Sequence, residues 1–72
     1  LFLMTDTRYI KLLRAAKRNA PHIAQRRLNQ LLTRREELAL DRRLAHEKND
    51  EKQLAKITEL EVEVEEYIQA LT

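Results

Sequence analysis

A chain of 72 residues without a single Cys cannot be held together by disulfides or by thiolate-bound zinc. The absence of Gly disfavours β-turns and phosphate-binding loops. Residues 1–35 carry nine Lys and Arg against one acid, and residues 36–72 carry five against eleven, so the formal charges are +8 and −6. Either the two parts neutralise each other or the basic part contacts a polyanion.

The composition predicts an all-α fold, because Leu, Ala, Glu, Lys, Arg and Gln dominate and all six favour helices. A chain of this length buries only about 60–65% of its unfolded surface, so self-association is expected to add stability. The two histidines, His22 and His46, are far apart in the chain and form no ligand pair. We therefore expect no metal and no cofactor.

The first predicted helix spans residues 7–19, after residues 1–6, which are expected to be disordered or foreign to the natural chain. Thr5 or Asp6 is the expected N-cap. At about 100° per residue, one face of the helix is apolar and the other is basic. The apolar face comprises Tyr9, Ile10, Leu12, Leu13, Ala16 and Ala20. The basic face comprises Arg8, Lys11, Arg14 and Arg18. Pro21 ends this helix and suits the first turn of the next.

The second predicted helix spans residues 21–48. Its packing seam follows alternating spacings of three and four residues, and two arginines in the seam are expected to weaken it. The seam comprises Leu28, Leu31, Arg35, Leu38, Arg42 and Ala45. Leu40 and Leu44 lie about 120–160° away from Leu28 around the helix, which predicts a second packing partner.

A turn is predicted at Asn49-Asp50, because residues 46–53 contain no apolar side chain and the apolar series changes phase there. Asn49 can adopt the left-handed conformation that ends a helix, and Asp50 with Gln53 resembles a capping box. A single continuous helix with a polar patch is the alternative.

The third predicted helix spans residues 50–71 and has an apolar stripe with glutamates outside it. The stripe comprises Leu54, Ile57, Leu60, Val64, Tyr67, Ile68 and Leu71. Antiparallel packing on the second helix sets Leu31 against Ile68 and brings Arg34 and Arg35 near Glu65. An antiparallel dimer of unbroken helices would satisfy the same charge pairing.

We expect one helical domain over residues 1–72, in which a short first helix precedes an antiparallel hairpin, and two chains form a homodimeric bundle. Such a dimer would cover the leucines of both faces and the apolar face of the first helix. The predicted interface comprises Leu28, Leu31, Leu38, Leu40, Leu44, Leu54, Ile57, Val64, Ile68 and Leu71.

Enzymatic activity is not expected, since the chain has no Cys or Ser nucleophile and no paired histidines. The favoured function is self-association or recognition of another protein through helix packing, as an adaptor or regulatory protein. The alternative is a small regulatory nucleic-acid-binding protein that contacts phosphates through its basic region. The candidate contacts are Lys11, Arg14, Lys17, Arg18, Arg26 and Arg27.

No apolar run approaches the ~20 residues that span a bilayer, and the apolar start of the chain is shorter than a signal-peptide core. We therefore expect a cytoplasmic protein. Binding of the basic helix to an anionic membrane surface is the least favoured of the three binding modes.

Overall fold

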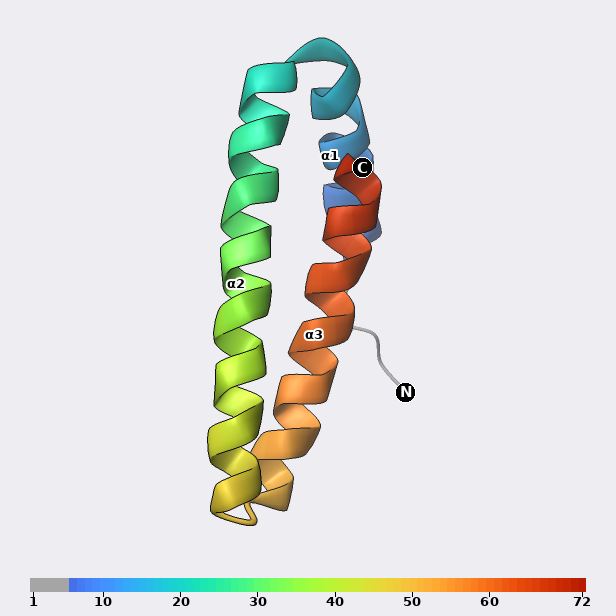
Figure 1. Ribbon diagram of the computed structural model, residues 1–72. Coiled ribbons are helices and arrows are strands. Elements are labelled where there is room, and N and C mark those ends of the chain that lie inside the picture. Colours follow the sequence, from blue (N-terminus) through green and yellow to red (C-terminus); the bar gives the residue numbers. More distant parts are fainter. Residues whose placement is uncertain (1–5) are drawn as a thin grey trace.

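A computed structural model describes residues 6–72, which form three α-helices: α1 (Thr7–Asn19), α2 (Pro21–Glu47) and α3 (Glu51–Leu71). α2 and α3 run antiparallel, and α1 folds back beside the end of α3, at the extremity opposite the α2–α3 turn (Figure 1). The described residues form no strand, so the all-α prediction is confirmed. Each helix begins and ends within one residue of its predicted limits.

The turn between α2 and α3 follows from the conformation of Asn49. This residue has φ 53°, in the left-handed region that asparagine tolerates better than most residues. Its N–H donates to the His46 carbonyl (3.1 Å), and the Asp50 N–H donates to the Ala45 carbonyl (3.0 Å). These two bonds form a Schellman motif, which ends α2. The Asp50 carboxylate then accepts from the Gln53 N–H (3.1 Å) and starts α3. The alternative of one continuous helix is therefore wrong.

The junction between α1 and α2 is a single residue. Ala20 is extended (φ −143°) and its N–H still donates to the Ala16 carbonyl (2.7 Å), while Pro21 begins α2. At the other end of α1, the Asp6 carboxylate accepts from the Arg8 N–H (2.9 Å). Asp6 is thus the N-cap, one of the two residues predicted for that position. Thr5, the other predicted cap, and the predictions for residues 1–5 lie outside the described residues.

The core lies between α2 and α3 and is closed at one end by α1. The buried residues of α2 recur every seven positions, as in a coiled coil. They are Ala24, Leu31, Leu38 and Ala45. From α3 and α1 the buried residues are Ile57, Val64, Tyr67, Ile68, Ala70, Leu71 and Leu13. Leu38 and Ile57 are each only 1% exposed and form the centre of this core.

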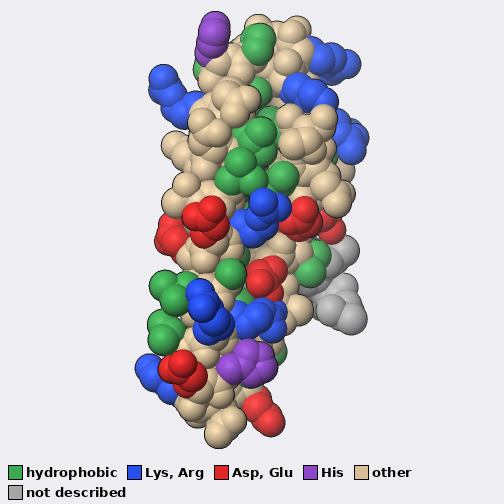
Figure 2. All heavy atoms as spheres, viewed as in Figure 1, with side chains coloured by type: hydrophobic (Ala, Val, Ile, Leu, Met, Phe, Trp, Pro, Cys, Tyr) green, Lys and Arg blue, Asp and Glu red, His purple; other side chains and the backbone are tan. Residues whose placement is uncertain are grey.

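Arg35 and Arg42, the two arginines of the predicted seam, lie along the edge of the core, and each bonds to α3. Their side chains are 50% and 33% exposed, so they add no buried apolar contact to the seam. Arg35 pairs with Glu65 (3.4 Å), as the antiparallel alignment predicts, and Arg42 pairs with Glu61. Figure 2 shows such alternating charges along the middle of the hairpin.

The hydrogen bond to Glu61 raises the pKa of Arg42. Partial desolvation opposes this rise, and the negative charge of Glu61 adds to it.

The hairpin covers most of the apolar face of α1. Leu13 is buried and Tyr9, Ile10 and Ala16 pack against the core. Leu12, which was predicted on the same face, is 66% exposed, because it lies about 100° from Leu13 around the helix. One chain therefore covers α1 without a second copy. Of the ten predicted interface residues, only Leu40 and Leu44 are exposed, at 50% and 46%.

Candidate functional site

One end of the molecule carries many cations and no carboxylate side chain. Residues 7–30 and 67–72, which we call the cationic end, contain seven Lys and Arg and no Asp or Glu. The fold brings these segments together, because α1 packs on both α2 and α3. In Figure 2, Lys and Arg side chains stand along the edge over α1, whereas Asp and Glu appear only lower down the hairpin. The charge separation in the sequence thus becomes a separation in space.

Three of these cations form a stripe on the solvent side of α1. Lys11, Arg14 and Arg18 lie at spacings of three and four residues, so they share one face over about 10 Å of helix. All three are exposed. No ion pair joins them to any carboxylate among residues 6–72. Their guanidinium and ammonium groups are therefore free to contact an external anion.

Lys17 differs from these three, because its ammonium donates to the Thr72 carbonyl (2.9 Å). Carbonyls in the last turn of a helix lack intrahelical partners, and a cation there is favourable. Beside this contact is an open hollow of about 380 Å³, with Gln69 and Ala70 on its α3 side and Arg14, Lys17 and Arg18 on its α1 side. Lys17 thus holds α1 to the end of α3.

Arg27 is also engaged within the chain. Its Nε–H donates to the Tyr9 hydroxyl (2.5 Å), its Nη1 donates to Gln30 (3.0 Å), and its guanidinium lies 5.5 Å from the centre of the Tyr9 ring. These contacts fix one side of α1 against α2. Arg27 therefore positions α1, and its guanidinium is less available to contact a phosphate than those of Arg14 and Arg18.

A pair of tyrosines, which the sequence did not reveal as a pair, completes the docking of α1. The Tyr9 and Tyr67 rings meet edge to face, with centroids 4.8 Å apart. The Tyr67 hydroxyl accepts from the Asp6 N–H (3.2 Å). Both tyrosines lie on predicted apolar faces, yet periodicity within a helix does not say which other helix that face meets.

The predicted cations thus fall into two groups. Lys11, Arg14 and Arg18 share one exposed surface, and Arg26 is exposed on α2 within the same cationic end. Lys17 and Arg27 bond to other parts of the chain. Whether the exposed group binds a polyanion stays a prediction.

Residues 6–72 contain neither a metal-binding cluster nor a membrane-spanning helix. They contain no cluster of three or more His, Cys, Asp or Glu side chains placed to hold a metal ion. No helix among them is both long and apolar enough to cross a membrane. No protein-family model matches the chain, and neither does any curated protein or solved structure. What the chain binds must therefore be inferred from the charge and geometry of its own side chains.

Proposed function

We propose that this chain is a non-enzymatic helical module that binds the phosphate backbone of a nucleic acid through its cationic end. The observation that carries the proposal is the exposed, unpaired stripe of Lys11, Arg14 and Arg18 in a region without Asp or Glu side chains. A surface of this kind attracts a polyanion and releases the counterions condensed on it. Arginine suits this role, because its planar fork of N–H donors matches two phosphate oxygens.

Of the two functions expected from the sequence, self-association through helix packing now has less support than nucleic-acid binding. Self-association was favoured partly because the apolar face of α1 needed cover, and the hairpin of the same chain supplies that cover. The cations of α1, in contrast, remain exposed. This difference favours nucleic-acid binding over a function based on helix packing alone.

The aromatic residues indicate a duplex in preference to a single strand. Proteins that hold single strands stack bases on exposed aromatic rings. Among residues 6–72 the aromatic side chains are Tyr9 and Tyr67, which pack against each other, and Tyr67 is only 8% exposed. They are committed to docking α1. Backbone contact with a duplex needs cations and a rigid support, and this end of the chain provides both.

The remainder of the hairpin orients the contact. Glu59, Glu61, Glu63, Glu65 and Glu66 make the middle of α3 acidic, outside the cationic end. A molecule with this charge distribution is steered so that its cationic end approaches a polyanion first. We therefore expect the acidic part of α3 to face away from the bound nucleic acid.

The proposal is tested with two double variants that each remove two positive charges. Arg14→Gln with Arg18→Gln removes part of the α1 stripe, whereas Arg43→Gln with Lys52→Gln removes exposed cations nearer the α2–α3 turn. We expect the first pair to weaken binding to a mixed-sequence duplex by about tenfold to a hundredfold, and the second by less than about threefold. Fluorescence anisotropy at fixed salt measures both affinities.

Circular dichroism serves as the folding control, since all four positions are exposed and the substitutions should leave helicity unchanged. Equal weakening by both double variants would show that binding follows net charge and not the α1 stripe. Native affinity in the Arg14/Arg18 variant would remove α1 as the contact surface. Either result contradicts the proposal.

A further inference from the structure

We infer that a second copy of this chain packs antiparallel against the outer face of α2 near the α2–α3 turn, in a two-fold contact centred on Leu44. The inference concerns a different surface from the cationic end, so it goes beyond the proposed function. It rests on two exposed leucines, Leu40 and Leu44, on a hollow beside Leu44, and on two opposite charges, Asp41 and Lys48, placed symmetrically about Leu44 and Ala45.

Leu40 and Leu44 lie on successive turns of α2. Their side chains are 50% and 46% exposed. The residues around them on the exposed side of α2 are polar. The other large apolar side chains exposed among residues 6–72 are scattered singly: Leu12 on α1, Ile23 at the start of α2, and Val62 on α3. Single exposed apolar residues are ordinary, whereas two adjacent leucines form a small patch that can be buried by a partner.

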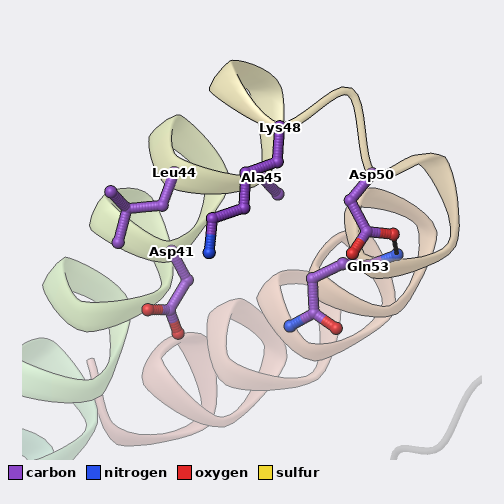
Figure 3. A pocket seen from close by; sticks show the side chains of 6 residues that line it. All are labelled: Asp41, Leu44, Ala45, Lys48, Asp50 and Gln53. Atoms are coloured by element: carbon purple, nitrogen blue, oxygen red, sulfur yellow. Dashed lines mark hydrogen bonds between the residues drawn. The ribbon is translucent and has the colours of Figure 1, made fainter.

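A hollow of about 310 Å³ lies directly beside Leu44. It is lined by Asp41, Leu44, Ala45 and Lys48 on the α2 side and by Asp50 and Gln53 on the α3 side. Figure 3 shows Lys48 extending along α2 in the direction of Asp41, while Asp50 and Gln53 close the opposite side. An apolar projection next to a hollow is self-complementary, because in a two-fold contact each copy offers the same patch to the other.

The charges around Leu44 select a second copy in the antiparallel direction. Asp41 and Lys48 lie seven residues apart and line the same hollow, with Leu44 and Ala45 midway between them. Neither forms an ion pair with another residue of the described chain. When a second α2 runs antiparallel through the same centre, Asp41 of each copy meets Lys48 of the other, which makes two unlike pairs. A parallel copy would instead align Asp41 with Asp41.

The size of the patch predicts a weak, reversible contact. Two half-exposed leucines with their neighbours bury less than the ~1,200 Å² at which stable interfaces begin. Residues 36–63 carry nine acids and five bases, which opposes the approach of two copies. At about 0.15 M salt the Debye length is only ~8 Å, so the close Asp41–Lys48 pairs outweigh that general repulsion. An antiparallel dimer also places the two cationic ends at opposite extremities.

The test is a charge exchange, followed by sedimentation velocity at several protein concentrations and about 0.15 M salt. Asp41→Lys alone and Lys48→Asp alone each turn both unlike pairs into like pairs, and we expect each to weaken self-association about tenfold. The double variant, Asp41→Lys with Lys48→Asp, recreates the unlike pairs in reverse. We expect it to restore association to within about twofold of the native chain.

Two control variants separate this contact from other causes. Arg43→Asp changes the net charge as Lys48→Asp does, but on another side of α2, and it should leave association unchanged. Leu44→Gln should weaken association without loss of helicity, because Leu44 is exposed. A native chain that stays monomeric at every concentration overturns the inference and leaves the patch to a different protein. Failure of the double variant to restore association, or equal weakening by Arg43→Asp, also overturns it.

Discussion

Replacement of Leu38 by Ala lowers the free energy of unfolding by about 3–5 kcal/mol, the range for a fully buried leucine that leaves a cavity behind. Leu38 is 1% exposed and lies in the seven-residue repeat of α2 that packs on α3. A chain of this size has only several kcal/mol of stability in total. We therefore expect a large part of the variant population to be unfolded even without denaturant. Urea unfolding followed by far-ultraviolet circular dichroism measures the change.

Leu40→Ala is the matched control, because it makes the same chemical change two residues further along α2, where the side chain is 50% exposed. We expect this variant to lose less than about 1 kcal/mol of stability. Similar losses at both positions would mean that α2 does not present Leu38 to α3. In that case the antiparallel packing of the two helices would be wrong.

Removal of the Tyr67 side chain has the second large effect on stability. Tyr67→Ala is expected to cost about 3–4 kcal/mol, because a buried aromatic ring and its edge-to-face contact with Tyr9 are both lost. Tyr67→Phe keeps the ring and removes only the acceptor of the Asp6 N–H, so about 1 kcal/mol is expected. Urea unfolding measures both values.

Hydrogen exchange shows where the Tyr67→Ala variant loosens. Since Tyr67 holds the start of α1, amide protection should fall most in α1 and least near the α2–α3 turn. Retention of native protection in α1 would contradict the role of the two tyrosines in docking it. A Tyr67→Phe variant as unstable as Tyr67→Ala would contradict the ring contact and assign the effect to the hydroxyl.

The helix limits were predictable because local chemistry sets them. Pro21 cannot continue a preceding helix, and Asn49 followed by Asp50 supplies both a left-handed residue and an N-cap. The apolar periodicity of α3 also predicted most of its buried residues correctly. These signals lie within a few residues of the feature that they determine, so no knowledge of the tertiary structure is needed.

The docking of α1 was not predictable from such signals. A helical wheel shows which residues share a face, but it does not show which part of a broad apolar face is covered, and Leu12 was therefore misplaced. The exposed cations of α1 were recognised from its basic face. The internal bonds of Lys17 and Arg27 depend on Thr72 and Tyr9, which are distant in the sequence and meet only in the folded chain.

The most direct test of nucleic-acid binding is a fluorescence-anisotropy titration of the native chain against a mixed-sequence DNA duplex at several salt concentrations. If Lys11, Arg14, Arg18 and Arg26, which are all exposed, each neutralise a phosphate, the logarithm of the binding constant falls linearly with the logarithm of salt concentration. The expected slope is about −3 to −4. Absence of binding at low salt, or an affinity that does not change with salt, would contradict the proposed contact between the cationic end and a phosphate backbone.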